Sequence, residues 1–200
     1  MPKLVSTAVQ LAALLPTLLV AAPTMAQDKP VLRPVRDVAV DYRAIGGPAG
    51  SEATTTRMEW SQSLQKLRVD VPGIGWSVAH HGKGRGFIVM QEARRIMDMP
   101  ALVQQAQLGP APDATFTKEG TAQVAGLACT IWRYRDKNSE GTTCLTAEGV
   151  MLRTLATMSG ITGGSEAISV VFGPQDPARF DEPEGYARVQ PRQPRTRPQP

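Results

Sequence analysis

Side chains that bind metals or act as catalytic nucleophiles are scarce in this sequence. It contains only two histidines and two cysteines among 200 residues. His80 and His81 are adjacent, so in a strand they would point to opposite faces and could not converge on one metal ion. No G-x-S-x-G motif presents a serine nucleophile, and Gly82, Gly84 and Gly86 do not have the spacing of a dinucleotide-binding loop. We therefore expect no enzyme activity, no metal site and no cofactor.

The central part of the chain also lacks an excess of positive charge. The formal net charge is +4, but Lys3 lies at the N-terminus and four arginines lie near the C-terminus: Arg188, Arg192, Arg195 and Arg197. Between these ends, residues 27–187 carry one more acidic than basic side chain. A nucleic-acid-binding surface needs lysine and arginine clustered on the folded part, so we expect no nucleic-acid partner.

The first 26 residues have the three parts of a secretory signal peptide. One lysine precedes an uncharged apolar stretch, Leu4–Val20, and small residues follow in Ala21–Ala26. A membrane anchor is the alternative, since about 20 apolar residues can span a bilayer. Gln10 and Pro16 interrupt the stretch, however, and no basic stop-transfer cluster follows it directly. We expect cleavage near Ala26 and a periplasmic or secreted protein.

The two cysteines are predicted to form one disulfide. Cys129 is the first cysteine, so none stands at the cleavage site and the mature protein should be soluble rather than lipid-anchored. An even number of cysteines in an exported chain favours a structural bond between Cys129 and Cys144. If the two face each other across a hairpin, Ile131 faces Thr142, unless a bulge shifts the register. Closing a loop of about 15 residues contributes roughly 3 kcal/mol.

Alternation of apolar and polar residues predicts strands through most of the mature chain. About nine or ten short strands are expected from eleven candidate segments, which are 38–42, 54–60, 66–71, 76–80, 87–91, 95–99, 114–119, 127–135, 142–146, 150–157 and 168–172. One short helix is expected at 101–108, between Pro100 and Gly109. Because this helix falls in the middle of the strand order, a curved antiparallel sheet wrapping a helix fits better than a sandwich.

The chain divides into four parts on this interpretation. Residues 1–26 are the signal peptide, 27–34 a linker, 35–188 a single antiparallel β domain, and 189–200 a disordered tail rich in proline and arginine. The tail could touch an anionic surface. A structural or interaction protein of the cell envelope is therefore the alternative to a ligand carrier.

Large apolar residues on the predicted strands and near the helix are mostly expected in the core. Methionine is also a soft, adaptable lining for apolar ligands, and a helix lying over a concave sheet could move to admit one. The residues expected to line such a cavity are Trp60, Trp76, Met97, Met99, Leu102 and Trp132.

Five segments together resemble a family of exported bacterial domains of unknown function that is similar to the LolA-like half-barrel. These segments are Asp37–Tyr42, Met58–Val71, Val124–Trp132, Thr143–Val150 and Phe180–Tyr186. The resemblance implies an incomplete antiparallel barrel with helical cover. LolA itself ferries lipoproteins through the periplasm, but a fold does not fix a function. The expectation of a non-enzymatic protein that binds an apolar or lipid-like ligand comes from the predicted architecture.

Overall fold

The computed structural model describes residues 29–46, 55–99, 110, 113–137, 139–158 and 161–190. In this part of the chain twelve strands form one sheet, accompanied by a short 3-10 helix, η1. Their bounds are β1 Val38–Gly46, β2 Thr55–Ser61, β3 Lys66–Val71, β4 Gly75–His80, β5 Arg85–Met90, β6 Arg95–Asp98, β7 Thr115–Val124, β8 Leu127–Arg135, β9 Glu140–Leu145, β10 Met151–Met158, β11 Ile161–Phe172, η1 Pro177–Phe180 and β12 Ala187–Val189.

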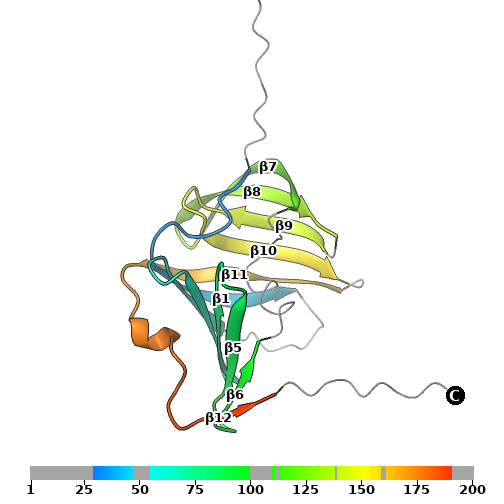
Figure 1. The fold of residues 1–200 in the computed structure, drawn as a ribbon. Coiled ribbons are helices and arrows are strands. Elements are labelled where there is room, and N and C mark those ends of the chain that lie inside the picture. The colour runs from blue at the N-terminus through cyan, green and yellow to red at the C-terminus, as the bar shows by residue number, and fades with distance from the viewer. Residues whose placement is uncertain are drawn as a thin grey trace, which may run out of the picture.

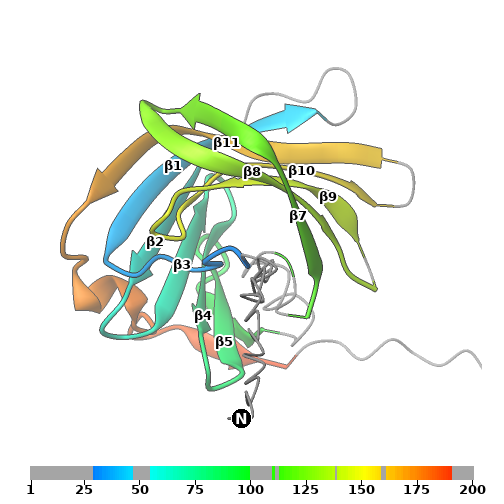
Figure 2. The ribbon, with the colours of Figure 1, turned by 90° about the horizontal axis from the view of Figure 1, so that it is seen from above.

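The sheet consists of two meanders joined in the middle by β1. Its order is β12-β6-β5-β4-β3-β2-β1-β11-β10-β9-β8-β7, with antiparallel pairs except for the parallel pair of β12 and β6. The wing β1–β6 and the wing β7–β11 stand at a steep angle to each other (Figure 1) and enclose a concave side (Figure 2). Because β7 and β12 end the order without meeting, the sheet is curved but not closed. The predicted mainly-β, incomplete-barrel architecture is confirmed.

The core lies where the two wings meet, and the alternation in β1 explains its position. Val38, Val40 and Tyr42 are buried at alternate positions. They belong to one buried cluster with Trp60 and Leu67 of the first wing and with the cysteines and Leu152 of the second. The hydroxyl of Tyr42 donates to the carbonyl of Met151 and so ties β1 to β10. Burial raises the pKa of this hydroxyl.

Two strands are longer than the sequence suggested. β11 begins at Ile161 rather than 168, and it contains a Gly-Gly pair that is more typical of a turn. Gly164 faces β10 so closely that a Cβ on it would lie 1.8 Å from the carbonyl oxygen of Thr154. These glycines therefore permit close strand approach instead of ending the strand. β7 extends past residue 119 because a bulge between Lys118 and Gly120 shifts its register.

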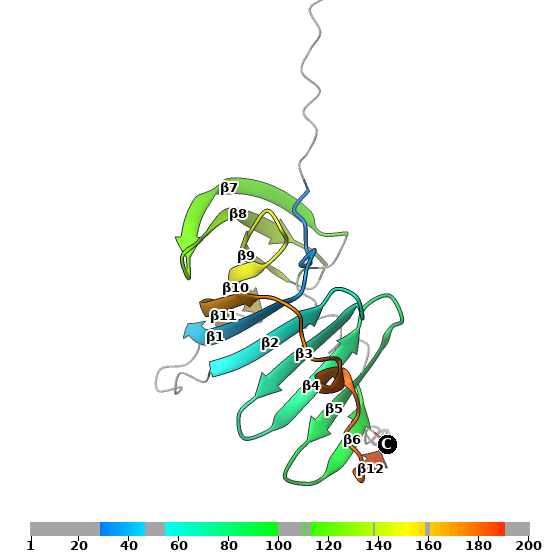
Figure 3. The same cartoon turned by 90° about the vertical axis from the view of Figure 1, so that its left-hand side faces the viewer.

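The C-terminal segment forms a belt, residues 173–189, across the outer face of the first wing (Figure 3). Within it, η1 contacts β3, and the Phe180 side chain is fully buried. Asp176 caps η1 by accepting a hydrogen bond from the Ala178 N–H at 3.0 Å. β12 then pairs with β6. Regular structure therefore extends one residue into the tail that was predicted to be disordered. Neither η1 nor β12 was expected from the sequence.

Several predicted segments lie outside the described residues. They are the signal peptide at 1–26, the helix at 101–108 and the tail from residue 191 onward. In the part of the chain that the structure describes, no helix is long and apolar enough to cross a membrane.

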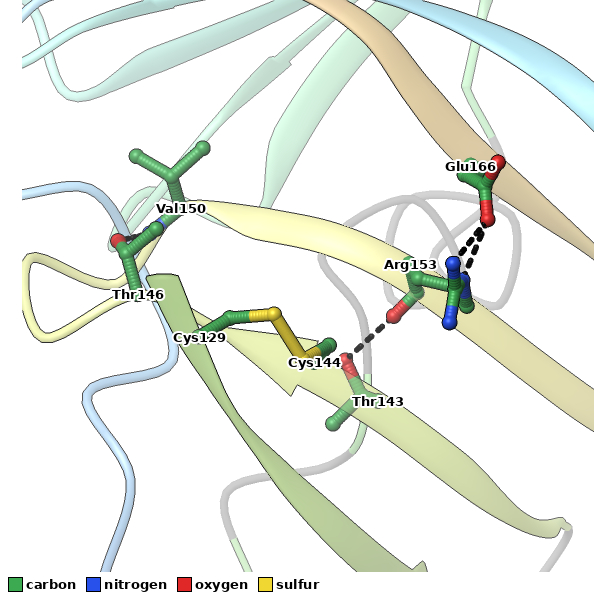
Figure 4. The surroundings of a disulfide bond; sticks show 7 residues. All are labelled: Cys129, Thr143, Cys144, Thr146, Val150, Arg153 and Glu166. Atoms are coloured by element: carbon green, nitrogen blue, oxygen red, sulfur yellow. Dashed lines mark hydrogen bonds and ion pairs between the residues drawn. A yellow bond between two sulfur atoms is a disulfide. The ribbon is translucent and has the colours of Figure 1, made fainter. Parts of the chain in front are cut away.

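The expected disulfide joins β8 to β9 (Figure 4). The Cα atoms of Cys129 and Cys144 are 5.4 Å apart, within the usual range for a disulfide. Beside the bond, the hydroxyl of Thr146 accepts the Val150 N–H at 3.0 Å and closes the turn into β10. The bond thus crosslinks the hairpin at its end near this turn, within the main core cluster.

The predicted hairpin register is wrong by two residues. Ile131 pairs with Cys144 and not with Thr142, so the two cysteines are diagonal neighbours on the ladder. The loop is shorter than expected because Asp136 closes it: its backbone N–H donates to the Ser139 carbonyl at 2.9 Å, and its carboxylate accepts the Ser139 N–H at 2.7 Å. This Asx-type turn lets the strands pair sooner.

Candidate functional site

The segment before β1 crosses the second wing as a strap, residues 29–36 (Figures 1 and 3). Near its end the Val35 N–H donates to the Glu148 carbonyl at 3.0 Å, and the Arg36 guanidinium pairs with the Glu148 carboxylate at 2.8 Å. The same guanidinium lies over the Phe172 ring, 3.8 Å from its centroid. We interpreted most of this segment as a linker, but residues 29–34 line two hollows of the molecule.

Gly149 is the point where the strap comes closest to the sheet. Its φ of +81° is in the left-handed region that favours glycine. A Cβ there would lie 2.1 Å from the carbonyl oxygen of Arg33 and 2.8 Å from a methyl carbon of Val31. The turn conformation and the seat of the strap therefore both depend on glycine at this position.

Beneath the strap lies an inner pocket with an apolar lining and a volume of about 50 Å³. The strap contributes Leu32, Arg33 and Pro34, and the two wings contribute Val38, Val40, Met58, Trp60, Leu67, Leu145, Val150 and Met151. A water molecule in the liquid takes up about 30 Å³, so this space holds only a small group. Pro110 and Gly149 complete the lining, and a long alkyl chain needs more room than this space offers.

On the other side of the strap is a wider hollow, the mouth, with a volume of about 400 Å³. It shares Leu32, Arg33, Pro34 and Trp60 with the inner pocket. Among the described residues that line it, Lys29 and Arg33 are charged, and none is an aspartate or a glutamate.

The electrostatics near the mouth favour negative charge. Burial lowers the pKa of Arg33. His81, whose ring lies 6.5 Å from the Trp60 indole, has its pKa lowered by burial first and then by the positive charges of Arg33 and His80. Burial is the main cause of the His81 shift, and the charges of Arg33 and His80 act in the same direction.

A third hollow, the outer groove, is much larger, with a volume of about 1060 Å³. It lies between the β3–β4 and β5–β6 turns and the belt, and it is lined by charged and aromatic side chains that include Arg57, Arg68, Asp70, Trp76, Arg94 and Tyr186. The guanidinium of Arg68 lies 4.5 Å from the Trp76 ring centroid, and that of Arg94 lies 5.1 Å from that of Tyr186.

A network of ion pairs beside the outer groove holds the belt. Arg179 of η1 pairs with Glu59 and with Asp70, both at 2.6 Å, and Arg57 pairs with Glu59 at 2.9 Å. Glu59 is buried, which raises its pKa, but its bonds to Arg179 and Arg57 outweigh burial and lower the pKa overall. The carboxylate is thus ionised and structural.

Two of the predicted lining residues line different hollows. Trp60 lines the inner pocket and the mouth. Trp76 lines the outer groove, and its Nε1 atom is buried without a hydrogen-bond partner among the described residues. Trp132 is buried on β8 with its ring edge-on to Phe116.

The other three predicted residues lie at or beyond β6. Met97 pairs with Ile88, and Met99 is buried just after the strand, where its N–H donates to the Gly86 carbonyl at 2.8 Å. Leu102 lies outside the described residues. The role of these residues in binding stays a prediction.

Within the described ranges, no group of three or more histidine, cysteine, aspartate or glutamate side chains could hold a metal ion. The Nδ1 atom of His80 is hydrogen-bonded to the His81 carbonyl oxygen at 2.8 Å. The strap residues Leu32 and Pro34 were missed as pocket residues, because nothing in their local pattern distinguishes a packed strap from a linker.

Comparison with known proteins gives a fold but no family. No protein-family model matches the sequence, and no curated protein does either. Among solved structures, an uncharacterized conserved protein from Thermus thermophilus aligns with a TM-score of 0.55 and 13% identity, over 78% of this chain and 91% of that one. MucB in complex with MucA(peri) aligns with a TM-score of 0.50 and 13% identity, over 76% of this chain and 56% of that one.

A LolA superfamily protein from Nitrosomonas europaea also aligns, with a TM-score of 0.42 and 9% identity, over 76% of this chain and 93% of that one. The curved, incomplete antiparallel sheet predicted from the resemblance is thus a fold that this chain shares with the Thermus thermophilus protein and with MucB. At these identities the likeness concerns the fold alone. The chain spans little more than half of the MucB chain.

Proposed function

We propose that this chain is an exported, non-enzymatic protein that binds an apolar or lipid-like group in the inner pocket beneath the strap. The observation that carries the proposal is the pocket itself, which is lined by apolar side chains of both wings and covered by a separate segment of the chain. The disulfide suits an oxidising, extracytoplasmic destination. The fold, a curved sheet with an open concave side, is compatible with such a carrier.

In this proposal the strap moves to admit the ligand. The polar contacts that hold the strap are weak. Its ion pair between Arg36 and Glu148 is exposed, with 52% and 42% of the two side chains accessible. Pairs of this kind contribute about 0.2–1 kcal/mol. The Val35–Glu148 backbone hydrogen bond adds about 1 kcal/mol. Packing of Leu32 and Pro34 and the Arg36–Phe172 contact add to these two polar contacts. A ligand that buries apolar surface can replace this packing and so stabilise the open state.

The test is uptake of a fluorescent fatty acid by the purified mature protein, together with native mass spectrometry for co-purified lipid. Leu32→Trp fills the pocket from the strap side without altering either wing. We expect it to weaken uptake at least tenfold. Val171→Trp is the matched control, because Val171 is 57% exposed on β11 and does not line the pocket. Absence of uptake by the unaltered protein, or equal uptake by both variants, contradicts the proposal.

A second candidate is an interaction protein of the cell envelope. It is favoured by the outer groove, whose volume of about 1060 Å³ and aromatic and arginine lining suit a protein partner. MucB, which shares the fold, has been solved in complex with MucA(peri). If this candidate holds, deleting residues 189–200 should weaken association with membranes or cell wall at low salt, and Trp76→Ala should weaken capture of a protein partner. Unchanged association in both variants argues against it.

A further inference from the structure

The inner pocket and the mouth are two parts of one site. They share Leu32, Arg33, Pro34 and Trp60, so they adjoin each other along the strap and at the Trp60 side chain. The lining changes sharply from one part to the other. The inner pocket is apolar apart from Arg33, whereas the mouth adds Lys29, Gln62 and other polar groups. A site with an apolar end and a polar end matches a molecule built in the same way.

The charge of the mouth selects among such molecules. Its cations are Lys29 and Arg33, and the described residues that line it include no acidic one. Among the described residues neither cation takes part in an ion pair, whereas Arg36, the next cation along the strap, is neutralised by Glu148. The positive charge of the mouth is therefore available to a ligand.

Burial strengthens this preference. Arg33 is half-buried, and burial lowers its pKa. A guanidinium taken partly out of water without a carboxylate beside it is unfavourable unless another anion approaches it. The charge of Arg33 also reaches His81, whose ring lies near the Trp60 indole: after burial, it is the next cause that lowers the His81 pKa. A neutral or cationic headgroup would leave this charge unbalanced.

We infer that the ligand of this site is an amphiphile with an anionic headgroup, such as a carboxylate or a phosphate, held at the mouth by Lys29 and Arg33. Its apolar end enters the inner pocket as the strap lifts. This inference rests on the proposed function, because it names the ligand class of the same pocket. The paired cations accept the head through charge-assisted hydrogen bonds, which are the strong class of hydrogen bond.

The experiment varies the head and keeps the chain constant. Dodecanoate, dodecyl phosphate, dodecanol and dodecyltrimethylammonium, each below its micellar concentration, displace a fluorescent fatty acid from the mature protein. We expect both anions to bind at least tenfold more tightly than dodecanol, the size of effect of one charge-assisted hydrogen bond. Dodecyltrimethylammonium should bind least. Salt should reduce the preference for the anions, because the mouth is open to solvent.

Charge variants locate the effect. Lys29→Gln with Arg33→Gln should remove the preference for the anions over dodecanol. Lys83→Gln with Lys118→Gln is the matched control, because it removes the same net charge at exposed positions on the β4–β5 turn and on β7. If the control pair loses the preference equally, long-range charge and not the mouth is responsible, and the inference is overturned.

The possible results distinguish this inference from the proposed function on which it rests. Equal binding of all four amphiphiles overturns the anionic preference but leaves the apolar pocket in place. Failure of the unaltered protein to bind any of them overturns the proposed function, and the inference falls with it. Tight binding of the two anions alone, lost in the Lys29 and Arg33 variant, supports both.

Discussion

Replacing Gly149 with alanine tests whether the strap is seated on the sheet as the geometry indicates. An L-residue held at a φ of +81° costs about 1–2 kcal/mol. The added Cβ would also lie 2.1 Å from the Arg33 carbonyl oxygen, against an ordinary contact of at least 3.4 Å, so the strap must lift. Lifting it breaks the Val35–Glu148 hydrogen bond, which is worth about 1 kcal/mol. The total loss expected is about 2–3 kcal/mol.

Gly82→Ala is the matched control for this prediction. Gly82 has a φ of +80°, and an added Cβ there has nothing within 4 Å. It should therefore show the backbone cost of about 1–2 kcal/mol without the collision. Urea unfolding followed by tryptophan fluorescence measures both variants.

A second measurement reports on the strap itself. Trypsin should cleave after Arg36 faster in Gly149→Ala than in Gly82→Ala, because only the former displaces the segment around that bond. If the two variants lose the same stability and are cleaved at the same rate, the strap does not rest on Gly149 and the reasoning is refuted.

Three further predictions concern the rest of the fold. The unreduced protein should contain no free thiol, and Cys129→Ser with Cys144→Ser should lose roughly 3 kcal/mol in urea unfolding, as expected for a crosslink of 15-residue separation; two titratable thiols would contradict the bond. Phe180→Ala should cost about 3–5 kcal/mol, because the ring is fully buried beneath the belt; a loss below about 1 kcal/mol would show that the belt is not packed. The pKa of Glu59 is lower in the folded protein than in the unfolded chain, so its contribution is complete above the unfolded pKa, near 4.5, and is lost as pH falls through the folded value. Glu59→Gln should therefore flatten the fall of stability below pH 4.5 measured by unfolding at a series of pH values, and an unchanged profile would exclude the role given to its pairing with Arg179.

Strands were predictable from sequence where one face is buried and the other is wet. The alternation of Val38, Val40 and Tyr42 identified β1, because each of these side chains enters the core. The sequence pattern was misleading at Gly164. Glycine permits two strands to approach closely there, but glycine is also typical of turns. The hairpin register was missed because it depends on hydrogen bonds of Asp136 within the loop, which no apolar pattern records.

The site was less accessible to sequence reasoning than the fold. Trp60 could be proposed as a lining residue, because a large aromatic side chain on a predicted strand must face one side of the sheet or the other. The strap residues Leu32 and Pro34 carry no such periodic signal, since they bind the sheet through packing. Which aromatic residues share a cavity also depends on how the wings bend, and this placed Trp60 and Trp76 in different hollows.

The pairing of β1 with β11 bears on how the molecule folds once its chain has been exported, as we propose. The first strand finds its second neighbour only when nearly the whole sequence is available, since Val38 pairs with Phe172. Until then the first wing can form from local hairpins while one edge of β1 stays open to wrong partners. The pocket needs both wings, so it forms only with this last long-range pairing. Slow folding and a need for protection from aggregation therefore follow from where its lining residues lie in the chain.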